Sequence, residues 1–92
     1  MPDLNNNNPI TADGDYDVEW YSGRSGVFGA AGTFGGGTLK LQYKVGETWV
    51  DFTGSSLTED GGFEFVSPVA DVQVALSGAT SPNINVVITR KK

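Results

Sequence analysis

The 92-residue sequence contains neither cysteine nor histidine. Without cysteine, no disulfide framework and no thiolate metal site can form. Without histidine, the commonest general base, metal ligand and pH-sensitive side chain is missing. Ser-x-x-Lys and Gly-x-Ser-x-Gly nucleophile patterns are also absent. The carboxylates at Asp51, Glu59, Asp60 and Glu64 fall at predicted turns and exposed strand positions, where a catalytic pair is hard to assemble. We therefore expect no enzyme, no catalytic residue and no cofactor.

Long apolar runs and clustered basic residues are also lacking. No apolar run approaches the roughly 18 residues of a membrane helix, and the N-terminus lacks the regions of a signal peptide. Six Lys and Arg stand against eleven Asp and Glu, and basic residues cluster only at Arg90-Lys91-Lys92. A nucleic-acid binder normally carries a basic patch. We expect a cytoplasmically made protein that binds no nucleic acid, membrane or small-molecule substrate. The net charge of −5 would complement a basic partner surface.

Glycine, in contrast, is abundant. Seven of the thirteen glycines lie between Ser22 and Gly37. Neither a P-loop nor a G-x-G-x-x-G fingerprint is present, so phosphate binding is not indicated. We interpret residues 22–26 as a turn, residues 27–34 as a strand that allows close backbone approach, and residues 35–37 as a bend.

The clearest local structure is a hairpin between residues 38 and 53. Residues 38–45 alternate apolar and polar side chains, as a half-buried strand does, and residues 48–53 are rich in β-branched and aromatic types. Gly46-Glu47 between them suits a type II′ turn. The register that this turn imposes pairs Val45 with Thr48, Tyr43 with Val50 and Leu41 with Phe52. It leaves Trp49 on the outer face, opposite Lys44.

The rest of the chain predicts further strands and no helix. Alternation marks residues 16–22, 62–67, 71–76 and 85–90, with Gln73, Ala75 and Val87 pointing outward. Residues 13–92 are therefore expected to form one all-β domain, an antiparallel β-sandwich of about six to eight short strands with a jelly-roll or Ig-like arrangement. The expected core comprises Val18, Trp20, Leu39, Leu41, Tyr43, Phe52, Phe63, Phe65, Val72, Val74, Leu76, Val86 and Ile88.

Asp13, Asp15, Asp17 and Glu19 place a carboxylate at every second position. Their spacing is not that of an EF-hand. An extended strand would also spread them over about 20 Å. We interpret them as a solvated strand face, with a calcium site as the alternative, and predict no metal ligands.

Residues 1–12 are expected to form a flexible arm, because they have little to bury. One interpretation is a disordered terminus. The other is an arm that orders on a neighbouring subunit, with Asn5, Asn6, Asn7 and Asn8 beside an anchor formed by Pro9 and Ile10. Deleting residues 1–12 should then leave the fold intact and weaken attachment.

Trp49 and Tyr21 are expected to be exposed aromatic residues. Such side chains serve sugar binding or a protein interface, or merely pack on the surface, as Trp49 would with Lys44. A protein interface is our main interpretation. The candidate interface residues are Asn5, Asn6, Asn7, Asn8, Pro9, Ile10, Tyr21, Phe28, Phe34 and Trp49.

Four motifs carry a family resemblance. They are GTFGGGTLKLQY at 32–43, TWVD at 48–51, LSGAT at 76–80 and NVVI at 85–88. Together they resemble small all-β structural proteins of tailed bacteriophages, in which a GTFGGAT-x-LQ strand is followed by a tryptophan strand and a closing N-V-x-V strand. The resemblance covers roughly residues 26–90. Gln73 and Ala75 stand where that pattern often has an arginine.

The resemblance implies a non-enzymatic virion protein, most plausibly a capsid decoration or cement protein on the capsid surface. Such proteins commonly sit as homotrimers on the head shell, so the implied partners are the major capsid protein and further copies of the chain. The alternatives are a carbohydrate- or receptor-binding module on a virion fibre, and a tail or neck component.

Overall fold

The chain folds as a β-sandwich, as its alternation patterns predict. The computed structural model describes Leu4, residues 8–52 and residues 54–90. These residues contain seven strands and no α-helix. The strands are β1 (Gly14–Glu19), β2 (Arg24–Thr33), β3 (Thr38–Val45), β4 (Thr48–Asp51), β5 (Gly61–Ser67), β6 (Asp71–Ser77) and β7 (Asn83–Arg90). No helix that could span a membrane occurs in this part of the chain.

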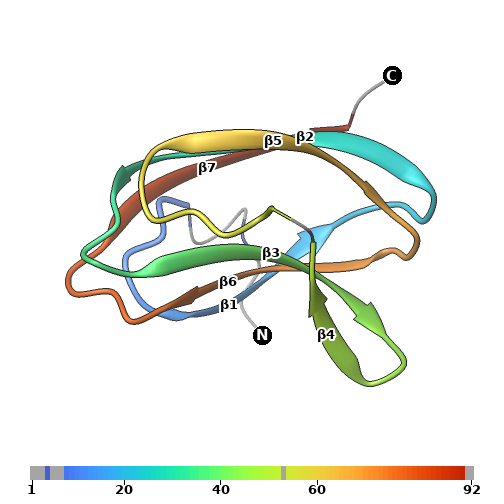
Figure 1. Cartoon of the computed structure of the whole chain (residues 1–92), viewed down its shortest axis with the longest axis horizontal. Coiled ribbons are helices and arrows are strands. Elements are labelled where there is room, and N and C mark those ends of the chain that lie inside the picture. Colours follow the sequence, from blue (N-terminus) through green and yellow to red (C-terminus); the bar gives the residue numbers. More distant parts are fainter. Residues whose placement is uncertain (1–3, 5–7, 53, 91–92) are drawn as a thin grey trace.

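The strands form two antiparallel sheets that face each other. The four-stranded sheet has the order β1-β6-β3-β4, and the three-stranded sheet has the order β5-β2-β7. Figure 1 shows β5, β2 and β7 as the upper layer, β1, β6 and β3 as the lower layer, and the β3–β4 hairpin projecting from the lower layer. Apart from that hairpin, every connection between consecutive strands crosses from one sheet to the other.

The β3–β4 register is the predicted one. Val45 pairs with Thr48, Lys44 with Trp49 and Tyr43 with Val50. The Phe52 N–H donates to the Leu41 carbonyl at 3.0 Å and continues the register. Gly46 has a φ of 63°, and Glu47 is not among the residues of positive φ. A positive φ at the first central residue alone is the type II′ pattern, so the turn prediction is confirmed.

The hydrophobic core fills the space between the sheets. Its buried members are Leu4, Ile10, Tyr16, Val18, Trp20, Phe28, Ala30, Phe34, Leu39, Leu41, Phe65, Val72, Val74, Leu76, Ile84 and Val86. Of the other expected core residues, Phe52, Phe63 and Ile88 are partly buried against it, and Tyr43 is half-buried. Within the predicted strand of residues 27–34, close approach is present at Gly32, where a Cβ would meet the backbone of Asn83. The turn predicted for residues 22–26 is wrong for residues 24–26, which belong to β2, and the backbone of Gly26 lies against the ring of Trp20.

The N-terminal segment does not lie apart from the domain. Ile10 is fully buried, and its backbone exchanges two hydrogen bonds with Ile84 on the outer edge of β7, at 2.8 and 3.0 Å. The side chain of Asn8 extends this pairing, because its Nδ2 donates to the Val86 carbonyl and its Oδ1 accepts from the Val86 N–H. The expectation of a separate arm is therefore wrong for Leu4, Asn8 and Ile10. Deleting residues 1–12 would remove part of the core.

The loop after β4 covers the neighbouring edge of β3. Leu57 and Leu39 exchange two backbone hydrogen bonds of 2.8 Å, next to the stretch of β3 that pairs with β4. Ser55 is buried, and its hydroxyl donates to the Leu41 carbonyl at 3.1 Å. This loop therefore satisfies backbone groups of β3 that the short strand β4 does not reach.

Candidate functional site

The predicted interface residues fall into three places. Asn5, Asn6 and Asn7 lie outside the described residues, and Asn8 and the exposed Pro9 run along the β7 edge. Ile10, Phe28 and Phe34 are in the core of the chain, with at most 5% of their surface exposed. Because buried side chains present no surface to a partner, the assignment of these three residues to an interface is wrong. Tyr21 and Trp49 are brought together.

Tyr21 and Trp49 line one groove at the end of the four-stranded sheet. The groove has a volume of about 600 Å³. Its lining residues are Asp17, Val18, Glu19, Trp20, Tyr21, Lys44, Trp49, Ala70, Asp71 and Val72. Residues 17–21 come from β1 and its continuation, residues 70–72 from the start of β6 and the residue before it, and the remaining two from the β3–β4 hairpin. Hence two elements far apart in the sequence supply its two outer aromatic rings, those of Tyr21 and Trp49.

The aromatic rings of the groove differ in exposure. Trp20 is 8% exposed and anchors the groove to the core through Phe65, with ring centroids 4.9 Å apart. Tyr21 is 52% exposed, and the Arg90 guanidinium lies 4.7 Å from its ring centroid. Trp49 is half-buried, with the Lys44 ammonium 5.9 Å from its ring. Both outer rings therefore already lie within reach of a cation.

The groove carries more negative than positive charge. Glu19 on β1 stands directly opposite Asp71 on β6, and Asp17 stands opposite Gln73. All three carboxylates are exposed, and none has an ion pair in the part of the chain that the structure describes. Like charges opposite each other on a sheet are destabilising. The arrangement is therefore a site at which a cation would relieve repulsion.

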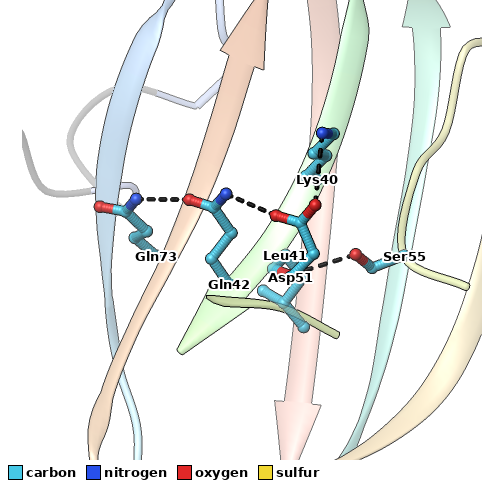
Figure 2. Close-up of polar contacts among 6 residues, drawn as sticks. All are labelled: Lys40, Leu41, Gln42, Asp51, Ser55 and Gln73. Carbon is cyan, nitrogen blue, oxygen red and sulfur yellow. Dashed lines mark hydrogen bonds and ion pairs between the residues drawn. The ribbon is translucent and has the colours of Figure 1, made fainter. Parts of the chain in front are cut away.

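A row of polar side chains crosses the sheet beside the groove (Figure 2). Gln73 Nε2 donates to Gln42 Oε1 at 2.6 Å, and Gln42 Nε2 donates to Asp51 Oδ1 at 2.6 Å. Lys40 lies 3.3 Å from the other oxygen of Asp51. The hydrogen bond from Gln42 lowers the pKa of the Asp51 carboxyl below its ordinary value, partial burial opposes this, and Lys40 adds to the lowering. The ionised Asp51 fixes the direction of both amides, because it can only accept hydrogen bonds.

That direction leaves Gln73 with an unpaired acceptor. Gln73 is 2% exposed, and its Oε1 is buried without a hydrogen-bond partner. Figure 2 shows this oxygen on the side away from Gln42, which is the side of β1 and of Asp17. Gln73 points to the outer face of the sheet, as expected, but it is buried there because β6 is an inner strand whose neighbours cover the side chain. Two acceptors, Gln73 Oε1 and the Asp17 carboxylate, therefore lie on adjacent strands.

The outer face of the other sheet is different in character. Val66 on β5, Val27 on β2 and Val87 on β7 are 62%, 44% and 64% exposed. The neighbouring outward positions of these strands carry glycine, alanine, serine, threonine and asparagine, with Glu64 as their charged residue. We call this surface the valine face. The outward direction of Val87 was predicted, but the placement of three exposed valines on one face depends on the strand order.

The carboxylate ladder is a solvated surface. Asp13, Asp15, Asp17 and Glu19 are all exposed. Asp13 accepts hydrogen bonds from the backbone N–H groups of Gly78 and Ala79, both at 3.1 Å, so it holds the β6–β7 loop. Among the described residues, no group of three or more carboxylates is arranged to hold a metal ion.

The groove contains residues that sequence reasoning did not select. Glu19 was interpreted only as part of a solvated strand face and Asp71 was not selected, and their pairing follows from the contact of β1 with β6. Each stands on the outward side of an alternating strand, and this is the signal that marks it. Comparison with protein-family models, curated proteins and solved structures found no match to this chain. Nothing in those comparisons links it to the bacteriophage proteins that its motifs resemble, so its function is argued from its own surfaces.

Proposed function

We propose that this chain is a non-enzymatic structural protein of a bacteriophage particle, a capsid decoration protein that binds and reinforces the head shell as a homotrimer. In this proposal it is made in the host cytoplasm and ends on the capsid surface, with the major capsid protein as its partner. The sequence motifs at 32–43 and 85–88 suggest the particle, and the valine face is the observation that carries the binding role.

The valine face has the chemistry of a protein interface. The centres of interfaces are depleted in charge, and this face carries three exposed valines with one carboxylate, that of Glu64. The glycine and alanine positions beside the valines keep it flat, so another surface can approach the strands closely. Each of its three strands contributes a valine.

The mass of the protein in solution tests whether the chain forms a trimer. Light scattering over about a tenfold range of concentration should give three times the mass of one chain. Val87→Asp should give the monomer, because it places a charge on the valine face. Val45→Asp is the matched control, since Val45 is 52% exposed on the hairpin and lies outside the valine face. A wild-type monomer, or equal loss of mass in both variants, would contradict the trimer.

The location on the particle needs a separate test. Antibodies to the chain should label the heads of particles of the phage that encodes it, in negatively stained micrographs. Labelling confined to tails or fibres would replace the capsid assignment with that of a tail, neck or fibre component. Particles without any label would overturn the virion role.

A glycan-binding module is the second candidate, because Tyr21 and Trp49 line one groove and sugars stack on aromatic rings. Trp49→Ala separates the two functions. It should abolish binding on a glycan array if the groove holds a sugar, while leaving the solution mass of a trimer unchanged.

A further inference from the structure

We propose that the groove between β1, β6 and the β3–β4 hairpin binds arginine or lysine side chains of a basic segment on a partner protein. The groove lies on the four-stranded sheet, on the opposite side of the sandwich from the valine face. The inference therefore does not depend on a trimer or on a phage particle.

Charge complementarity selects the ligand. Asp17, Glu19 and Asp71 face the groove with one basic side chain, that of Lys44, among the lining residues. Glu19 and Asp71 oppose each other across β1 and β6, and neither has an ion pair within the described residues. A guanidinium or ammonium group between them would replace a repulsion by two attractions. An anionic ligand would be repelled by these carboxylates, and a neutral donor would gain hydrogen bonds but no charge attraction.

Hydrogen bonding points the same way. The carboxylates of Asp17, Glu19 and Asp71, which line the groove, can only accept hydrogen bonds. The unpaired Gln73 Oε1 is buried and Gln73 does not line the groove, so a ligand does not reach it. A ligand in the groove must therefore donate to the carboxylates. Arginine and lysine side chains are donors without acceptors.

The aromatic rings complete the recognition. A planar guanidinium stacks on aromatic faces, and tryptophan is the best of them. Arg90 already lies over Tyr21, and Lys44 lies near Trp49, so these rings show the geometry that a ligand cation would adopt. The volume of about 600 Å³ exceeds that of one side chain, so an extended segment with more than one basic residue fits better than a free amino acid.

A peptide titration of the full-length chain tests the proposal. The probe is the capped peptide Gly-Arg-Gly-Arg-Gly, with Gly-Gln-Gly-Gln-Gly as the neutral control, followed by amide and indole resonances of the isotopically labelled protein. The arginine peptide should shift resonances of residues 17–21, 44, 49 and 70–72, and the neutral peptide should not. Raising NaCl from about 0.05 to about 0.5 M should weaken the binding several-fold. Absence of binding at millimolar arginine peptide would overturn the proposal.

Variants separate the groove from the overall charge of the protein. Glu19→Gln together with Asp71→Asn should weaken arginine-peptide binding at least about fivefold, as the loss of two exposed ion pairs would. Glu47→Gln together with Glu59→Gln is the matched control, because it also removes two exposed carboxylates and neither residue lines the groove. Equal weakening by the control, or none by the double variant of Glu19 and Asp71, would contradict the proposal. The competing outcome is that a neutral oligosaccharide displaces the peptide, and that its binding is lost in Trp49→Ala but kept in the double variant of Glu19 and Asp71. That result would identify a glycan as the ligand of the groove.

Discussion

The ring of Trp20 lies directly against the backbone of Gly26. A Cβ atom at position 26 would stand 2.6 Å from Cζ2 of that ring and 2.8 Å from the Thr89 carbonyl oxygen. Gly26→Ala should therefore destabilise the fold by about 1–3 kcal/mol, the usual cost of overpacking a core. Urea denaturation followed by tryptophan fluorescence measures this loss.

Gly29→Ala is the internal control on the same strand. A Cβ at position 29 would meet no atom within 4 Å, and the φ of Gly29 is not positive. We expect a change of less than about 0.5 kcal/mol, as for other surface substitutions. Equal destabilisation by the two alanines would show that Trp20 does not require the space above Gly26.

The side chain of Asn8 acts as a short extension of the sheet at the edge of β7. Asn8→Ala removes both hydrogen bonds to Val86 and should lower the free energy of unfolding by about 1–2 kcal/mol. It should also promote aggregation, because it uncovers backbone groups on an edge strand. Urea denaturation and size-exclusion chromatography report the two effects. Asn85→Ala, on the exposed side of the same strand, should change neither.

Asp51 should make stability depend on pH in the acid range. Its pKa in the folded state is lowered by Gln42 and Lys40, so its stabilising contribution is present above the ordinary carboxyl pKa of about 4 and is lost as the pH falls through the lower folded value. Asp51→Asn should therefore be less stable than the wild type near neutral pH. The difference between them should shrink below pH of about 4.

Denaturant midpoints between pH of about 2 and about 6 check this expectation. Glu47→Gln provides a matched loss of one exposed carboxylate that has neither Gln42 nor Lys40 beside it. A difference between wild type and Asp51→Asn that stays constant across the range would mean that the Asp51 contacts do not contribute to stability.

Glu19 and Asp71 oppose each other at a cost to stability. Glu19→Gln should raise the free energy of unfolding by about 0.2–1 kcal/mol in dilute buffer, because it removes a like-charge pair. The gain should disappear in about 1 M salt. Asp15→Asn removes the same charge opposite Ala75 and should give a smaller gain. Thermal denaturation at both salt concentrations distinguishes the two, and a larger gain in Asp15→Asn would contradict the interpretation.

The parts of the fold that were predictable are those decided by neighbours in the sequence. Alternation gives strand faces, and the Gly46-Glu47 turn gives the complete β3–β4 register. The rest depends on pairings between distant segments. Ile10 is buried because it pairs with Ile84, and the residues around Ile10 show no alternation that would predict this contact.

Alternation also states which way a side chain points, but not how deeply it lies. Gln73 is on the outward side of β6, yet it is buried because β6 is an inner strand with β1 and β3 on either side. Phe28 stands in a stretch of small residues where either face could have been the inner one. The groove could not be predicted either. It is formed by residues of β1, β6 and the β3–β4 hairpin, which come together only through the strand order.

The alternation of the chain between the two sheets has a kinetic consequence. Only β3 and β4 are neighbours both in sequence and in a sheet, so neither sheet can form from a contiguous piece of the chain. Search for distant partners makes folding slow, and we expect it at the millisecond-to-second end of the range for small domains. Apart from the β3–β4 hairpin, the same interleaving leaves no contiguous group of strands that could detach on its own. We therefore expect the rest of the domain to unfold only as a whole, so that the folded state has a long lifetime.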